Sequence, residues 1–139
     1  MTEITTATLT SDGPPQRFFA RWTDHATWPQ WSPDTEWVHL DGPVEAGTRG
    51  ALKPTKGPKA RFTISALQRD REYTDTTHLP GADLVFEHLA TQQDGRTRLD
   101  VHVSITGPLG FLWCRVLGTQ FRASVPADLR HLVDLVEAG

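Results

Sequence analysis

The chain alternates short β-prone segments with turn residues over most of its length, and this pattern constrains the fold more than any other feature. Between residues 36 and 106 the segments are rich in β-branched and aromatic residues. Turn dipeptides such as Pro80-Gly81 and Asp94-Gly95 separate them. Because the connections are short, we expect an antiparallel meander with strands at Glu36–Leu40, Thr48–Lys53, Ala60–Leu67, Glu72–Leu79, Ala82–Thr91 and Arg96–Thr106.

The N-terminal part predicts one more strand and two short helices. Thr2–Leu9 is rich in β-branched residues, and the following Ser11-Asp12-Gly13-Pro14-Pro15 is typical of a strand end and a helix start, with Asp12 as the expected cap. Phe18, Phe19 and Trp22 recur three to four residues apart, which predicts an amphipathic helix ending near Asp24. A second helical turn is expected at Thr27–Trp31.

The C-terminal part has the periodicity of one long helix. Its apolar residues recur at helical spacing after Gly107-Pro108: Leu112, Val116, Phe121, Val125, Leu129, Leu132, Val133 and Val136. We expect the helix to run to about Glu137 and to kink or restart at Pro126, which lacks a backbone donor. The whole pattern predicts an α+β helix-grip fold, in which a seven-stranded curved antiparallel sheet surrounds a long C-terminal helix and an apolar ligand cavity.

Composition narrows the function classes. The 139 residues suit one domain, 1–139, and 37% hydrophobic with 22% charged residues is typical of a globular protein. A net charge of −3 argues against a general nucleic-acid binder. Cys114 is the only cysteine, the N-terminus has no apolar signal core, and no apolar run is long enough to span a bilayer. We therefore expect a cytoplasmic protein whose oligomeric state, a homodimer included, the sequence leaves open.

Two tight turns allow the strand register to be derived. If Asp94-Gly95 is a two-residue hairpin turn, one face of that hairpin carries Ala90/Leu99, His88/Val101, Phe86/Val103 and Leu84/Ile105. This set is more apolar than the alternate residues, so we expect it to face the long helix. A turn at Pro80-Gly81 pairs Leu79/Ala82, Thr77/Leu84, Asp75/Phe86 and Tyr73/His88 in the same way.

The derived register places four polar side chains on an otherwise apolar inner wall: Tyr73, Asp75, Thr77 and His88. The Arg69-Asp70 turn adds Phe62, Ile64 and Ala66 to this wall. Buried polar groups need partners from one another, from water or from a ligand. The sequence does not decide whether Trp37 and His39, or instead Val38 and Leu40, face the interior.

Several motifs, taken in order, resemble the START-like SRPBCC superfamily. They are Trp28-Pro29-Gln30-Trp31-Ser32-Pro33, Leu40-Asp41-Gly42-Pro43, Gly47-Thr48-Arg49-Gly50, Leu79-Pro80-Gly81, Phe86-Glu87-His88 and Thr106-Gly107-Pro108-Leu109. The bacterial polyketide cyclase/dehydrase and lipid-binding branch is the most similar. The resemblance implies a START/Bet v 1-like fold with a deep pocket between sheet and helix. Members bind lipids, sterols, polyketides or plant hormones, and some catalyse cyclisation and dehydration, without a universal catalytic motif.

The polar wall has a catalytic and a structural interpretation. A histidine bonded to a phenol in an apolar pocket can act as general base, so Tyr73, His88 and Asp75 are the candidate catalytic residues. Burial would raise the pKa of Asp75 and let it share that work. The structural interpretation, a satisfied core network or a polar anchor for a ligand, is favoured, since structural networks also perturb titrating groups.

Candidate ligand-binding residues follow from the same wall and from the aromatic residues around it. They are Trp28, Trp31, Phe62, Ile64, Thr77, Leu84, Phe86, Val101, Val103 and Trp113. Trp28 and Trp31 are expected to cover one end of the cavity, where they gate ligand access or simply pack. The six histidines show no metal-ligand spacing, and phosphate loops are absent, so neither a metal nor another cofactor is predicted.

Three function classes remain. The leading hypothesis is a binding protein for a small apolar or aromatic ligand, such as a polyketide or lipid. The second is a cyclase/dehydratase or isomerase that uses Tyr73, His88 and Asp75 without a metal or nucleotide. The third is a non-enzymatic partner-binding or regulatory module of the same fold.

Overall fold

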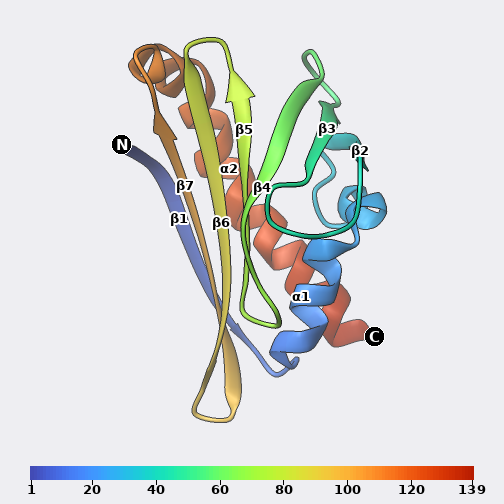
Figure 1. Cartoon of the computed structure of the whole chain (residues 1–139). Helices are drawn as coiled ribbons and strands as arrows, with labels where there is room; N and C mark the ends of the chain where they lie inside the picture. Colours follow the sequence, from blue (N-terminus) through green and yellow to red (C-terminus); the bar gives the residue numbers. More distant parts are fainter.

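A computed structural model of residues 1–139 contains one curved sheet of seven antiparallel strands, in the order β1-β7-β6-β5-β4-β3-β2 (Figure 1). The elements are β1 (Thr2–Ser11), α1 (Pro15–Thr23), the 3-10 helix η1 (His25–Gln30), β2 (Thr35–Leu40), β3 (Arg49–Pro54), β4 (Ala60–Gln68), β5 (Glu72–Leu79), β6 (Ala82–Gln93), β7 (Arg96–Thr106) and α2 (Gly110–Ala138). The predicted α+β class is confirmed, with its seven-stranded curved antiparallel sheet, its long C-terminal helix and its two short helices after β1. Helix α2 crosses one face of the sheet, and α1 lies beside the C-terminal end of α2.

The two predicted hairpins have the predicted register. Asp94 and Gly95 both have positive φ values, 54° and 77°, as a type I′ turn requires. Gly81, with φ 73°, follows Pro80 in the turn between β5 and β6. Every cross-strand pair derived from these turns is present, including Tyr73 opposite His88 and Phe86 opposite Val103. Turn chemistry therefore determines which side chains face α2.

The register departs from the prediction in β4. The pairing shifts between Ile64 and Ala66, so that Ala66 lies opposite Thr74 and Leu67 lies opposite Tyr73. This irregularity turns Ala66 away from the inner face and brings Leu67 onto it, because one extra residue reverses the alternation. Phe62 and Ile64, before the irregularity, are fully buried as expected.

The open question about β2 is settled by its pairing with β3. Leu40 lies opposite Gly50, which in turn lies opposite the buried Phe62. Val38 and Leu40 therefore share the inner face, and Trp37 and His39 are exposed on the outer one. A side chain at position 50 would collide with the Phe62 ring, which explains the glycine there.

Helix α2 runs unbroken through Pro126, so the predicted restart does not occur. Pro126 is exposed, as is Arg122, four residues earlier. Water can therefore satisfy the carbonyl that the proline leaves without a donor. None of the helices is long and apolar enough to cross a membrane.

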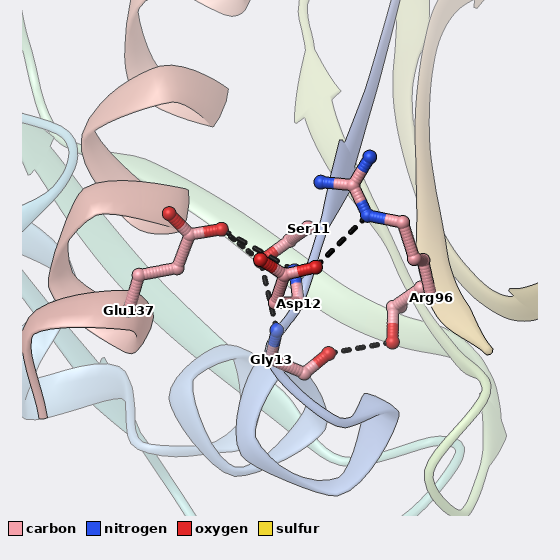
Figure 2. Close-up of polar contacts among 6 residues, drawn as sticks. Ser11, Asp12, Gly13, Arg96 and Glu137 are labelled. Carbon is pink, nitrogen blue, oxygen red and sulfur yellow. Dashed lines mark hydrogen bonds and ion pairs between the residues drawn. The ribbon is translucent and has the colours of Figure 1, made fainter.

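A polar cluster joins the β1–α1 connection to the end of α2 (Figure 2). The Ser11 hydroxyl donates to Glu137 Oε2 at 2.6 Å and accepts from the Gly13 amide at 3.0 Å. Asp12 accepts from Arg96 Nε at 3.0 Å, so this carboxylate does not cap α1 as predicted. The buried Thr97 hydroxyl donates to the Gly13 carbonyl at 2.6 Å. The cluster fixes the C-terminal end of α2 against the β6–β7 hairpin.

Candidate functional site

The four polar residues of the inner wall are buried as predicted. The exposed fractions are 0% for Tyr73, 2% for Asp75, 4% for Thr77 and 7% for His88. The predicted apolar neighbours surround them, all buried except the half-buried Phe86: Phe62, Ile64, Leu84, Phe86, Val101 and Val103. The sequence thus brings polar groups into an apolar interior, where each must find a partner.

The Tyr73 hydroxyl is the centre of a hydrogen-bonded network. It donates to Asp75 Oδ2 at 3.1 Å, and it lies 2.7 Å from Nε2 of His25. His88 makes a different contact, since its Nδ1 lies 3.1 Å from the backbone carbonyl oxygen of Tyr73. The histidine that meets the phenol is therefore His25, on η1, and His88 meets the backbone.

Sequence reasoning missed His25 because it lies outside the strands whose register could be derived. The only signal was its position three residues before Trp28, in the short helix that follows α1. Its imidazole stacks on the Trp28 ring at a centroid distance of 4.8 Å and on the Phe62 ring at 6.0 Å. Packing between η1 and the sheet, rather than local spacing, brings His25 to Tyr73.

Burial controls the ionisation of this network. Loss of hydration lowers the pKa of both His25 and His88 to about 4, so both imidazoles are neutral at pH 7. Burial raises the pKa of Asp75 to about 7, although the bond from Tyr73 opposes the rise. Burial and the Asp75 charge raise the pKa of the Tyr73 phenol well above its usual value.

The network has two hydrogen arrangements that depend on Asp75. When Asp75 is a carboxylate, it accepts from Tyr73, and Tyr73 accepts from the Nε2–H of His25. When Asp75 is protonated, it can donate to Tyr73, which then donates to a bare Nε2. The direction of the chain of hydrogen bonds therefore reverses when Asp75 gains or loses one proton.

Tryptophans enclose the polar end of the interior. The rings of Trp28 and Tyr73 meet edge to face at 5.7 Å, and Trp22 and Trp31 lie 5.5 Å and 6.5 Å from His88 between ring centroids. The Trp28 indole donates to the Trp22 carbonyl at 3.1 Å. Tyr73 is therefore sealed by aromatic side chains at this end.

The opposite end of the interior is more open. Val125, Leu129 and Leu132 on the C-terminal half of α2 are buried, whereas Leu117 and Phe121 on its N-terminal half are only half-buried. The Phe121 ring meets Phe86 edge to face at 5.5 Å between centroids. On the inner face of β6, Leu84 and His88 are thus buried, and Phe86 between them is half-buried next to Phe121.

A surface hollow opens beside this region. It has a volume of about 330 Å³ and is lined by Asp34, Pro54, Thr55, Lys56 and Gln120. Pro54 ends β3, and Gln120 precedes Phe121 on α2, so the hollow lies between the β3–β4 connection and the helix. Its lining is polar, in contrast to the aromatic pair of Phe86 and Phe121.

Trp113 lies at the N-terminal end of α2, away from the tryptophan cluster. It is half-buried, and its indole donates to the Pro80 carbonyl at 2.8 Å. This bond holds the start of α2 against the β5–β6 turn. Trp113 therefore fixes the N-terminal end of α2, in the half of the helix that carries Phe121, whereas Trp28 and Trp31 lie at the polar end of the interior around Tyr73 and His88.

Comparison with known proteins identifies the family. The family model described as polyketide cyclase / dehydrase and lipid transport matches residues 2–137. The chain belongs to this family. The match covers every strand and nearly all of α2. No curated protein shows significant sequence similarity to the chain.

Solved structures of the same fold include two aromatase/cyclases. The Zhui aromatase/cyclase from Streptomyces sp. R1128 is 16% identical, with a TM-score of 0.77 over 96% of this chain and 92% of that one. The di-domain ARO/CYC StfQ from the steffimycin biosynthetic pathway is 13% identical, with a TM-score of 0.79 over 99% of this chain and 51% of that one. Ara h 8.0201 is 16% identical, with a TM-score of 0.70 over 97% of both chains. These similarities establish the fold of this family member.

Proposed function

We propose that this family member binds a small apolar or aromatic molecule between the sheet and the N-terminal half of α2. The observation that carries the proposal is the half-buried aromatic pair, Phe86 on β6 and Phe121 on α2, whose centroids are 5.5 Å apart. A wall of apolar side chains with a few convergent polar groups is the usual composition of a small-molecule site. Membership of a family described by polyketide cyclisation and lipid transport supports the same class of ligand.

The proposed site uses the predicted binding residues in two ways. Phe86, Leu84, Val101 and Val103 form the wall beneath the ligand, and Trp28 and Trp31 close its far end. Phe62, Ile64 and Thr77 continue the wall on β4 and β5, and Trp113 holds the near edge of α2. A cytoplasmic location is part of this proposal, in keeping with a single cysteine that can form no disulfide within the chain.

Binding of a fluorescent apolar probe to matched variants tests the proposal. Phe121→Ala removes the ring above Phe86 and should weaken binding of 1-anilinonaphthalene-8-sulfonate about tenfold, because a phenyl side chain contributes more than 1.4 kcal/mol on burial. Phe111→Ala is the control, since Phe111 lies on the same helix but is 67% exposed. Equal affinities in both variants, or no saturable binding by the wild type, would contradict the proposal.

A second candidate function is acid–base catalysis of a cyclisation or dehydration. The observation that favours it is the Asp75–Tyr73–His25 chain of hydrogen bonds, together with a pKa of about 7 for Asp75. A general acid or base works best with a pKa near the operating pH. A substrate reaches the Tyr73 hydroxyl only after Trp28 or Trp31 moves, since Tyr73 is fully buried.

Turnover of a poly-β-ketone thioester tests this second candidate. Tyr73→Phe and Asp75→Asn should each lower the rate of ring closure about 10²–10⁴-fold if they transfer a proton in the rate-limiting step. His88→Asn should change that rate much less, because His88 contacts the Tyr73 backbone rather than its hydroxyl. Unchanged rates in the Tyr73 and Asp75 variants would remove both residues from the mechanism.

A further inference from the structure

Two indole nitrogens of the aromatic cluster, those of Trp22 and Trp31, are buried without a hydrogen-bond partner in the protein, as are Nδ1 of His25 and Oγ1 of Thr77. The His88 ring packs against both tryptophans and makes its hydrogen bond through Nδ1. The side chains of Trp22, Trp31 and His88 are all more than nine-tenths buried. We propose that His88 and Trp31 bind a hydroxyl group of the ligand, with Trp22 as a second donor. The proposal rests on the proposed ligand-binding function and names the ligand as a hydroxylated aromatic or apolar molecule.

The contact between His88 and the backbone determines which ring nitrogen is an acceptor. Nδ1 of His88 lies 3.1 Å from the Tyr73 carbonyl oxygen, which can only accept, so Nδ1 carries the hydrogen. The imidazole is neutral, because burial lowers its pKa to about 4. Nε2 is therefore a lone-pair acceptor, and it points away from the backbone that holds Nδ1.

The tryptophans differ in how their donors are used. Trp28 donates to the Trp22 carbonyl at 3.1 Å, so its N–H is satisfied. The N–H groups of Trp22 and Trp31 are buried without an acceptor, although both rings pack against His88 at centroid distances of 5.5 Å and 6.5 Å. An unsatisfied buried donor is costly, which favours a ligand atom or a water molecule there.

A hydroxyl group fits this set better than other polar groups. Its hydrogen can be donated to Nε2 of His88 while its oxygen accepts from an indole N–H. A carbonyl oxygen would leave Nε2 unpaired, and an ammonium group would leave the indoles unpaired. The partners thus select a phenol or an alcohol, and a bound water molecule is the alternative occupant.

The location of His88 connects this group to the proposed apolar site. His88 and Phe86 are two residues apart on β6 and share its inner face, where alternate residues are separated by about 7 Å. That separation matches the length of a fused pair of aromatic rings. A ligand of this length lying over Phe86 would have its far substituent at the level of His88 along the strand.

Equilibrium dialysis with 2-naphthol and 2-methylnaphthalene tests the inference, because the two probes differ only in a hydroxyl against a methyl group. The wild type should bind 2-naphthol about tenfold more tightly. Trp31→Phe, which keeps a ring but removes the donor, should abolish most of this preference. Trp28→Phe is the control and should change the affinity for both probes equally, since the Trp28 donor is satisfied within the protein.

A second variant removes the acceptor alone. His88→Asn retains a donor near the position of Nδ1 but has no atom at the position of Nε2, so it should also reduce the preference for 2-naphthol. Circular dichroism and a thermal melt of each variant confirm that it folds. Equal wild-type affinities for the two probes would overturn the hydroxyl site and leave the apolar site intact. Absence of binding by either probe would overturn the proposed function itself.

Discussion

The Nε2 atom of His25 lies 2.7 Å from the hydroxyl oxygen of Tyr73, and the two residues are 48 positions apart in the sequence. This contact joins the short helix η1 to the centre of the sheet. It also places a neutral imidazole next to the phenol whose other partner is Asp75. The stability and the pH response of the protein should therefore depend on this group of three residues.

Tyr73→Phe should lower the free energy of unfolding by about 2–6 kcal/mol. The substitution leaves two buried groups, Asp75 and His25, without their shared partner, and each unsatisfied group costs about 1–3 kcal/mol. Urea denaturation at pH 7 measures the loss. Thr8→Ala, which removes an exposed bond to Asp100, is the control and should change stability by less than about 1 kcal/mol. Similar losses in both variants would argue against the network.

Acidification should destabilise the protein through its buried histidines. The pKa values of His25 and His88 are lowered from 6.5 to about 4, so the unfolded chain binds more protons between these values. The contribution of the two neutral histidines to the free energy of unfolding is complete above pH 6.5 and is lost as the pH falls toward 4. Each histidine can contribute on the order of 3 kcal/mol over this range. In His88→Asn, the slope of unfolding free energy against pH should be smaller between pH 4 and pH 6.5. The reduction should be up to about 1.4 kcal/mol per pH unit, which corresponds to one bound proton.

Asp75 should have the opposite effect on the pH dependence of stability, because it destabilises the folded protein as the pH rises. Its pKa is raised from 3.8 to about 7, so the folded protein binds more protons than the unfolded chain between these values. Its contribution is complete below pH 3.8 and is lost as the pH rises through 7. Asp75→Asn keeps an acceptor for Tyr73 but cannot ionise, so it should gain stability over the wild type at pH 8 more than at pH 5.

The control for this experiment is Asp94→Asn. Asp94 is exposed in a turn with positive φ, where asparagine is equally well accommodated. Urea denaturation from pH 5 to pH 8 should give the same pH profile for this variant and the wild type. If the stability of Asp75→Asn changed with pH in parallel with that of the wild type, Asp75 would not titrate between pH 5 and pH 8.

The polar cluster at the end of α2 offers a matched pair of substitutions. Ser11→Ala removes the partner of both Glu137 and the buried Gly13 amide and should cost about 1–3 kcal/mol of unfolding free energy. Arg96→Ala breaks the exposed ion pair with Asp12 and should cost less than about 1 kcal/mol. Thermal melts of the two variants compare them directly, and the reverse order would contradict this assignment.

The register of the central strands was predictable because tight turns determine it locally. Asp94-Gly95 and Pro80-Gly81 allow few turn conformations, so every residue on the adjoining strands acquires a definite face. Tyr73, Asp75, Thr77 and His88 were placed on the inner wall from the sequence for this reason. The same argument failed beyond Ile64, because nothing in the sequence marks the irregularity that turns Ala66 outward.

The contacts within the site were not predictable from local pattern. His25 reaches Tyr73 through the packing of η1 on the sheet, which no periodicity encodes. The bond from His88 to the Tyr73 carbonyl depends on a rotamer rather than on register. Pro126 did not restart α2, because its position on the exposed side of the helix lets water satisfy the backbone. Tertiary packing decided the two histidine contacts, and access of water to the backbone decided the outcome at Pro126.

Intermolecular nuclear Overhauser effects between bound 2-naphthol and the assigned aromatic protons test the central claim most directly. We predict cross-peaks to Phe86 and Phe121, whose rings meet at 5.5 Å beneath α2, and none to the exposed Phe111. Cross-peaks confined to Phe111, or a saturated ligand without any contact to Phe86 and Phe121, would contradict a binding site between the sheet and the helix.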